Sequence, residues 1–517
     1  MNHDMAHCSM AADGTMTMDG IPFWMAAGGV VLIILLTHGY MMFRKAPDIG
    51  RVPYWTLNLL SAAWLKRLVK WPAFPLLIQS VPLLLLSLVI VAGLFGSPKG
   101  NIAPVLTWTW WWILLIFFVA GFGKLFCAIC PWEALSSMVT ALSLKSRLKR
   151  ITHDRPFPRW ARNIWPAIGF FVLLTWLELG MDITHSPAMT AVLGLFMSAM
   201  AVMLAVVYEK RAFCRYSCPV GRISGLYALF SPVELRPADA EICRTCDGKE
   251  CYHGSAKQTG CPTGLFPGHL TENTYCTLCS ECVRACPHDN LALNLRPPAT
   301  DLVRKNRFQW DESILAIVLL ALTSFHGLTM TPVWVSANNL LRVETGLGPK
   351  VMFTLLMLLM VLLPIGLFWV TARVASALTP SAGISTGVIF KAFAYSLIPV
   401  ALFYHLAHNC MHFFMEAGNL LPLLSDPLGW GWDLFGTAKK TYGAMLSMKA
   451  IWWLQIICVV VGHVFGVVAA DNLAKRLYDT SGLAKRVLYP LMFAMVLYSV
   501  FSVWLIAQPM DMRTSGM

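Results

Sequence analysis

The chain has 517 residues, of which 57% are hydrophobic and 13% are charged, and its formal net charge is +13. Soluble globular domains contain roughly 45–50% apolar and about 25% charged residues, so this composition excludes a water-soluble globular fold. Several apolar runs also exceed the roughly 18 residues that mark a transmembrane helix. We therefore expect an all-α polytopic membrane protein whose main solvent is lipid.

The apolar runs predict about ten transmembrane helices. They cover residues 23–43, 75–95, 105–126, 163–181, 189–208, 313–331, 351–372, 388–413, 449–470 and 487–507. These spans divide the chain into four expected parts. The parts are an extracytoplasmic Met- and His-rich tail (1–22), a five-helix membrane half with a Cys-Pro turn (23–208), a cytoplasmic cysteine-rich part with a second Cys-Pro turn (209–312), and a second five-helix half with a histidine stripe (313–517).

The distribution of basic residues predicts the orientation of these spans. No Lys or Arg precedes the first span, whereas Arg44 and Lys45 follow it directly, so we expect the N-terminus outside. With ten spans, 33 of the 40 Lys and Arg residues fall on the cytoplasmic side and 7 fall outside. Topology thus explains the net charge, and we expect no nucleic-acid partner. Because a basic n-region and an obvious cleavage site are both missing, we expect the first span to be retained rather than removed as a signal peptide.

The N-terminal tail is rich in soft metal ligands. They are His3, Met5, His7, Cys8, Met10, Met16 and Met18. Thioether and thiol sulfur atoms suit Cu(I), which is one interpretation of this tail. The other interpretation is a disordered tail that happens to contain many methionines.

Two short cysteine motifs follow the third and fifth spans, where both helices are expected to reach the cytoplasmic surface. The first contains Cys127 and Cys130 before Pro131, and the second contains Cys214 and Cys218 before Pro219. Four thiols from two adjacent helix ends could hold an iron-sulfur cluster. The basic residues expected to stabilise such thiolates are Lys124, Lys210, Arg211 and Arg215. The alternative is a pair of helix-ending turns with free thiols.

The cytoplasmic part contains eight further cysteines. Cys276, Cys279, Cys282 and Cys286 before Pro287 have the spacing C-x2-C-x2-C-x3-C-P, which is typical of a [4Fe-4S] cluster whose fourth cysteine ligates a second cluster. A reducing cytoplasm disfavours disulfides, and zinc sites usually pair two separated C-x2-C units.

A preceding group, with Pro262 after its last cysteine, consists of Cys243, Cys246, Cys251 and Cys261. By the crossed ligation of two-cluster ferredoxins, one cluster takes the first three of these cysteines with Cys286, and the other takes Cys261 with Cys276, Cys279 and Cys282. We therefore expect an inserted small α+β ferredoxin module that holds two [4Fe-4S] clusters.

The order of these motifs resembles the NapH/NosR/CcoG group of membrane polyferredoxins over about residues 75–298. The resemblance implies a multi-pass protein of the bacterial inner membrane that passes electrons between the quinone pool, or a cytoplasmic donor, and an extracytoplasmic acceptor. Two features depart from the pattern. The first turn is Cys-x2-Cys-Pro where the family usually has Cys-x3-Cys-Pro, and the extracytoplasmic flavin domain of NosR is missing.

The second membrane half carries a stripe of histidines. On a helix, His405, His408 and His412 point within a roughly 60° arc. His326 lies at nearly the depth of His405 and is the expected cross-helix partner, while His463 lies nearer the cytoplasm. Such a set can bind haem b, copper or another metal, or a quinone, and the alternative is hydrogen bonding between packed helices.

Together these features predict a membrane-bound iron-sulfur electron-transfer protein, an oxidoreductase subunit similar to quinol dehydrogenases. The expected partners are membrane lipid, quinone or quinol, and a redox protein among other respiratory subunits. An alternative is reduction or handling of copper for assembly of a respiratory metalloenzyme. A third possibility is a transporter with a regulatory ferredoxin module.

Overall fold

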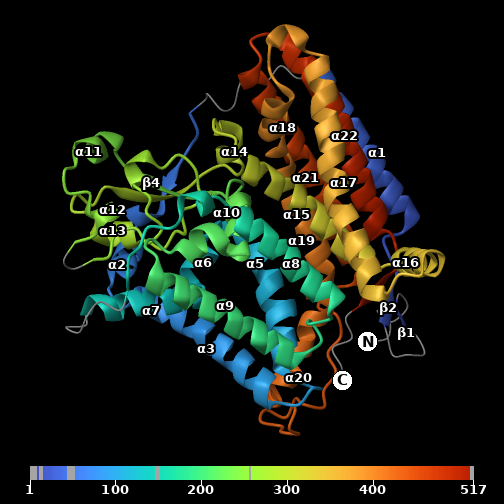
Figure 1. The fold of residues 1–517 in the computed structure, drawn as a ribbon, viewed down its shortest axis with the longest axis horizontal. Helices are drawn as coiled ribbons and strands as arrows, with labels where there is room; N and C mark the ends of the chain where they lie inside the picture. Colours follow the sequence, from blue (N-terminus) through green and yellow to red (C-terminus); the bar gives the residue numbers. More distant parts are fainter. Residues whose placement is uncertain (1–7, 11–15, 44–52, 146–151, 256–257, 513–517) are drawn as a thin grey trace.

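The computed structural model describes residues 8–10, 16–43, 53–145, 152–255 and 258–512. His3, Met5 and His7, which the sequence suggests as soft metal ligands, lie outside these residues. The described chain is mostly helical, with few strands. In Figure 1 the elements of the cysteine-rich part lie at one side, and strand β2 (Met16–Met18) lies at the opposite side near α16 (Pro332–Thr345).

Nine helices of the described chain are long and apolar enough to cross a membrane. They are α1 (Phe23–Phe43), α3 (Phe74–Phe95), the joined α4 (Ile102–Pro104), η3 (Val105–Trp111) and α5 (Trp112–Phe122), α9 (Pro187–Val207), α15 (Trp310–Thr329), α17 (Pro349–Ala377), the joined run from α18 (Thr386–Ala394) through α19 (Leu397–Glu416) and η8 (Ala417–Asn419) to α20 (Leu420–Ser425), α21 (Met448–Leu477) and α22 (Ser481–Ile506). The protein is therefore a multi-pass membrane protein. The expected span at 163–181 is the apolar helix α8 (Trp165–Gly180), whose 16 residues make it shorter than the other nine.

The spans α15 and α19 form the centre of the helix bundle. Both are largely buried inside the protein, unlike α3 and α17, whose leucines are mostly exposed to the surroundings. Helix α19 packs along α21, and Gly462 permits the close approach because a Cβ there would lie 2.5 Å from the Cβ of Phe403. Polar side chains on α15 and α19 are consequently shielded from lipid.

A small antiparallel sheet joins the two ends of the cysteine-rich part. Strand β5 (Leu291–Leu295) is central, between β4 (Val233–Pro237) and the short β3 (Leu57–Asn58). Four short helices lie between or after the strands: α11 (Ala240–Thr245), α12 (Glu250–His253), α13 (Glu281–Ala285) and α14 (Thr300–Arg304).

A buried ion-pair cluster ties this sheet to α14. The guanidinium of Arg296 lies 2.7 Å from Glu234 and 2.5 Å from Asp301. Burial opposes ionisation of Arg296, but the two carboxylates outweigh it and raise its pKa above the ordinary value. A buried cation with two hydrogen-bonded carboxylates is costly to disrupt, so this cluster fixes the sheet against α14.

Two further helices, α2 (Ala63–Lys70) and α7 (Pro131–Lys145), do not belong to the nine long spans. Helix α2 packs on α13, and α7 packs on α3 and α9.

A second antiparallel sheet brings the two ends of the described chain together. Strand β2 (Met16–Met18) pairs with β1 (Cys8–Met10) on one side and with β6 (Met510–Met512) on the other. The register places Met16 opposite Met512 and Met18 opposite Met510. The first and last strands therefore lie on the same side of the helix bundle, as the ten-span topology requires.

Candidate redox site

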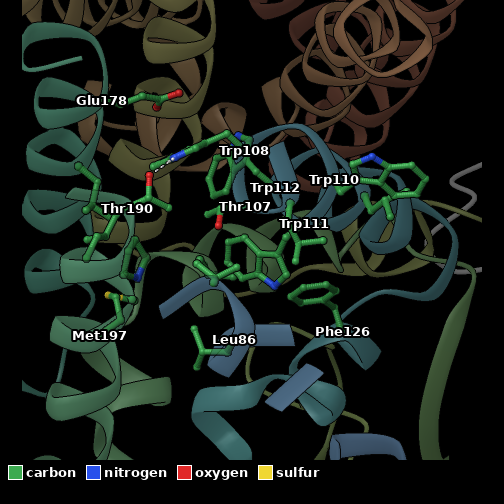
Figure 2. Close-up of a pocket in the computed structure, with 18 of the residues that line it drawn as sticks. Leu86, Thr107, Trp108, Trp110, Trp111, Trp112, Phe126, Glu178, Thr190 and Met197 are labelled. Atoms are coloured by element: carbon green, nitrogen blue, oxygen red, sulfur yellow. Dashed lines mark hydrogen bonds between the residues drawn. The ribbon is translucent and has the colours of Figure 1, made fainter. Parts of the chain in front are cut away.

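A largely apolar cavity of about 300 Å³ lies within the helix bundle, between α3, η3, α8 and α9 of the first membrane half and α15 and α19 of the second (Figure 2). Its wall includes a run of tryptophans from the third span: Trp108, Trp110, Trp111 and Trp112. Trp108 is held by a hydrogen bond of 3.1 Å from its indole nitrogen to the hydroxyl of Thr190 on α9. Trp108, Trp110 and Trp111 belong to a π-helical turn, and Trp112 directly follows it. Such a distortion often marks functional sites because it re-aims side chains within a helix.

One end of the cavity reaches the two Cys-Pro turns. Pro131 and Pro219, which directly follow Cys130 and Cys218, both line it, as do Ile129 and Val220. Each proline starts a helix, α7 in one case and α10 (Pro219–Tyr227) in the other, so each cysteine sits at the helix start. The cavity and the turn cysteines are therefore neighbours.

The structure brings the four turn cysteines into one group. Burial raises the pKa of Cys214, and the nearby Glu133, Cys218, Cys130 and Cys127 raise it further. Burial likewise raises the pKa of Cys218 to about 12, although a hydrogen bond from the backbone N–H of Gly221 opposes the shift. Cys214 also lies 3.5 Å from Glu133, three residues after Cys130, so the two turns are adjacent.

The expected cations surround this group only in part. Lys124 is fully buried, and burial together with the nearby Arg222 lowers its pKa to about 8. Arg211 bonds to Glu133 at 3.0 Å, and Glu133 in turn lies 3.5 Å from Cys214. Lys210 instead points to the carbonyl oxygen of Tyr252 at 3.4 Å. Arg222, which the sequence reasoning missed, is the additional buried cation.

The eight cysteines of the cysteine-rich part separate into two groups. The pKa of Cys251 is raised to about 12. Burial is the largest cause, and the nearby thiols of Cys286, Cys243 and Cys246 raise it further. Asn290 connects two members of this group, because its side-chain nitrogen lies 3.4 Å from Cys243 and its backbone nitrogen lies 3.4 Å from Cys286.

The second group is centred on Cys282. Its pKa is raised by burial first and then by Cys279, Cys276 and Cys261, with Cys251 of the other group as the weakest influence. The division into two groups follows the crossed pattern that the C-x2-C-x2-C-x3-C-P spacing implies.

A short polar bridge connects the turn cysteines to the second group. The buried cations Lys124 and Arg222 both donate to the carbonyl oxygen of Thr274, at 3.4 and 3.2 Å. Thr274 lies two residues before Cys276, whose thiol also influences Lys124. The turns and the cysteine-rich part are thus in direct contact through buried residues.

Within the described ranges, no three His, Cys, Asp or Glu side chains converge tightly enough to hold a single metal ion. A single ion needs all of its ligands within about 2.0–2.3 Å of one point. The cysteines of a [4Fe-4S] cluster bind different irons and so lie further apart. The assignment of clusters and metals to these residues remains a prediction.

The other end of the cavity is lined by ionisable residues. His326, His405 and His408 contribute to the wall, together with Glu178 of α8. The rings of His326 and His408 lie 5.0 Å apart, and Nδ1 of His326 lies 3.8 Å from Glu178. The cross-helix partner of His326 is therefore His408, one turn along α19 from the expected His405.

The remaining histidines take separate positions. His405 meets the hydroxyl of Tyr227 at 3.3 Å, and the ring of His412 lies 4.9 Å from that of His408. His463 bonds through its two ring nitrogens to the hydroxyls of Thr37 and Ser499, at 2.7 and 2.9 Å, and does not line the cavity. These hydroxyl contacts resemble ordinary packing between helices.

Sequence reasoning missed the tryptophan wall and Glu178. The run from Trp108 to Trp112 looked like part of an ordinary apolar span, and its role depends on the π-helical turn. Glu178 offered a signal, since an acidic residue inside a predicted span is costly and is usually functional.

Comparisons with known proteins support the resemblance. No family model matches the chain, and no solved structure matches it. YccM of Escherichia coli strain K12, named as an electron transport protein, is 27% identical over 223 residues, which cover 38% of this chain and 58% of YccM. An uncharacterised protein of Methanocaldococcus jannaschii is 26% identical over 186 residues, which cover 35% of this chain and 68% of the relative. The regulatory protein NosR of Stutzerimonas stutzeri is 26% identical over 217 residues, which cover 38% of this chain and 27% of NosR.

The chain thus spans little more than half the length of YccM and about a quarter of NosR. The resemblance to NapH/NosR-type proteins is confirmed, with modest identity over part of the chain. These relatives support a general role in electron transfer for this membrane protein.

Proposed function

We propose that this protein transfers electrons between a membrane quinol, bound in the aromatic cavity, and iron-sulfur clusters held by its cysteines. The observation that carries the proposal is the extent of the cavity. It reaches from His326 and His408 at one end to Pro131 and Pro219, beside the turn cysteines, at the other.

The donor set fits the proposed clusters. The two groups in the cysteine-rich part would each hold one [4Fe-4S] cluster, and the four turn cysteines would hold a third. Each cluster, when bound, supplies a site for one electron. Lys124 and Arg222 place positive charge between the turns and Thr274, where it favours the thiolate form that iron requires.

The cavity suits the flat, lipophilic head of a quinone. Four indole rings offer faces for stacking, and His326 and His408 offer ring nitrogens toward the quinone oxygens. Leu85 and Leu114 line the cavity and are also about 40% exposed on the lipid-facing side of the bundle. A hydrophobic tail could therefore extend into the bilayer while the head group is enclosed.

The positive-inside distribution orients this pathway. It would place the cysteine-rich part in the cytoplasm of a bacterium and the histidine end of the cavity nearer the outside. In this orientation the chain would work as a quinol-dehydrogenase-like subunit of the inner membrane. The onward partner would be another redox protein of the respiratory chain.

A glycine in the cavity wall allows a direct test. A Cβ at Gly194 would be in ordinary contact with Leu86, so leucine at this position can be accommodated by the backbone while its side chain occupies the cavity. We expect Gly194→Leu to weaken quinone binding roughly tenfold or more, as overpacking costs about 1–3 kcal/mol. Quenching of tryptophan fluorescence by added quinone measures this binding.

The matched control is Gly169→Leu on the neighbouring helix α8, where a Cβ would meet nothing within 4 Å. Anaerobic protein of both variants should keep its iron and be reduced by dithionite. Quinol should bleach the iron-sulfur absorbance of the wild type and of Gly169→Leu, and should act slowly on Gly194→Leu. A wild-type protein that dithionite bleaches and quinol does not would contradict the proposal.

A second candidate function is copper handling, and the register of the terminal sheet favours it. Strand pairing places Met18 opposite Met510, and both side chains are buried. Methionine sulfur is a soft ligand for Cu(I). Stoichiometric Cu(I) in purified protein, without any quinol-driven bleaching, would favour this second function over the first.

A further inference from the structure

A chain of buried ionisable residues leads away from the cavity on the side opposite the cysteines. It starts at His408 in the cavity wall and continues one turn along α19 to His412, whose ring lies 4.9 Å away. Nδ1 of His412 lies 3.1 Å from one carboxylate oxygen of Glu416. The other oxygen of Glu416 accepts a hydrogen bond of 3.5 Å from the hydroxyl of Thr109.

The chain ends at a second cavity. This cavity, of about 460 Å³, is lined by Glu416, Thr109, His185 and Lys440 among others. Trp108 lines both cavities, which are therefore adjacent, and Glu416 lines the second. The second cavity is more polar and gathers residues from three loops that join membrane spans.

The second cavity lies at the opposite end of the third span from the turn cysteines. Asn101 and Pro104 at the start of this span line it, whereas Cys127 follows the end of the span. About twenty residues of helix separate the two, which corresponds to roughly 30 Å at about 1.5 Å per residue. By the positive-inside rule, the cavity faces the outside.

The four groups of the chain are costly to bury without a purpose. His408, His412 and Glu416 are each at most 7% exposed, and Thr109 is 6% exposed. Nε2 of His412 is buried and has no hydrogen-bond partner within the described ranges. A histidine with one ring nitrogen bonded to a carboxylate and the other available can take up a proton on one side and release it on the other.

We propose that His408, His412 and Glu416 carry protons from a bound quinol to the outer face. This inference rests on the proposed function. Oxidation of one quinol breaks its two O–H bonds, sends its two electrons to oxidised iron-sulfur clusters on the cysteine side, and leaves two protons in a cavity walled by apolar side chains. The histidines and Glu416 accept these protons in turn and pass them to the second cavity. Electrons and protons therefore leave the quinol in opposite directions.

The test compares Glu416→Gln with the wild type in single-turnover reduction. Gln keeps the size of Glu416 and can still bond to Thr109 and His412, but it cannot take up a proton. We expect quinol to bleach the clusters roughly a hundredfold or more slowly in Glu416→Gln, because positioned proton transfer typically contributes about 10²–10⁴-fold. Reduction by dithionite and quinone quenching of tryptophan fluorescence should be unchanged. The matched control is Glu344→Gln on α16, an exposed acid outside the chain.

A second measurement follows the protons themselves. In lipid vesicles whose cysteine-rich part faces outward, a pH-sensitive dye trapped inside should report acidification when quinol is added. His412→Gln, which keeps a hydrogen-bond donor for Glu416, serves as the second variant and should also slow both signals.

The outcomes separate this inference from the proposed function. If quinol does not bleach the wild-type clusters, the proposed function is wrong and the inference falls with it. If quinol bleaches the wild type and Glu416→Gln at the same rate, or protons appear on the cysteine side, the proton chain is wrong while the quinol function stands.

Discussion

At the scale of single residues, the turn cysteines form a group of their own. Cys130 and Cys218 each precede a helix-starting proline, and both lie within the influence of Cys127. They lie with Cys127 and Cys214 in one group, whereas the eight cysteines of the cysteine-rich part form two groups of their own. The turn group should therefore be independent of the other two.

Replacing these two cysteines tests this independence. We expect Cys130→Ser combined with Cys218→Ser to remove about four irons per chain from a total of about twelve, because one [4Fe-4S] cluster loses half of its ligands. Iron and sulfide analysis of anaerobically purified protein measures the loss. The control is Cys410→Ser with Cys458→Ser, at two cysteines outside all three groups. Equal iron in the double variant and the wild type would mean that the turns are purely structural.

The sequence predicted how the cysteines group better than it predicted how the histidines pair. Cysteine spacing along the chain is a direct property of a cluster motif, so the two groups could be proposed without a structure. The pairing of His326 with His408 depends on how α15 and α19 are offset along their axes, which packing decides. Glu178, on a third helix, could not be placed against His326 for the same reason.

The helix α2 illustrates how one element depends on charge. Asp289, just after the last cysteine motif, forms ion pairs with two lysines of α2. One is Lys66, and the other is Lys70, whose Nζ lies 2.6 Å from a carboxylate oxygen of Asp289. Arg284 of α13 adds a hydrogen bond of 3.1 Å to the carbonyl oxygen of Val69. Partial burial opposes ionisation of Asp289, but the hydrogen bonds from the two lysines outweigh it and lower its pKa.

The contact of α2 with the cysteine-rich part should weaken in acid. A carboxyl whose pKa is lowered in the folded state contributes stability above its unfolded pKa of about 4, and this contribution is lost as pH falls through the folded pKa. We expect Asp289→Asn to speed amide hydrogen exchange in α2 roughly two- to fivefold at neutral pH, the range of an exposed ion pair. Asp479→Asn, at an exposed acid far along the chain, is the control. Unchanged exchange in α2 would show that Arg284 alone holds it.

At the scale of elements, the membrane spans could be predicted from the sequence, because a long run of apolar residues is enough to indicate a transmembrane helix. Nine of the ten expected spans appear as long helices, with ends shifted by up to seven residues except for the eighth, which continues to Ser425. The π-helical turn at Val105–Trp111 could not be foreseen, since it depends on neighbouring helices rather than on local preference. This turn shapes the cavity, so the candidate binding site was visible only in part.

For the whole molecule, the orientation can be tested with cysteine probes. We expect Asp182→Cys, in the loop before α9, to react with a membrane-impermeant maleimide on intact cells, because this loop lies on the side with few basic residues. Lys249→Cys, beside α12, should react only after the membrane is permeabilised. Labelling is measured relative to the parent protein. The reverse pattern would place the cysteine-rich part outside and contradict the proposed direction of electron flow.

The pairing of β2 with β6 constrains the number of membrane crossings. Two strands that hydrogen-bond to each other must lie on the same side of the bilayer, so the chain between them crosses an even number of times. The nine long helices among the described residues are an odd number, so the short helix α8 is the apolar helix that can supply the tenth crossing. Its 16 residues extend only about 24 Å, against a hydrocarbon core about 30 Å thick. The bilayer should be locally thinned beside α8, next to the wall of the cavity that Glu178 lines.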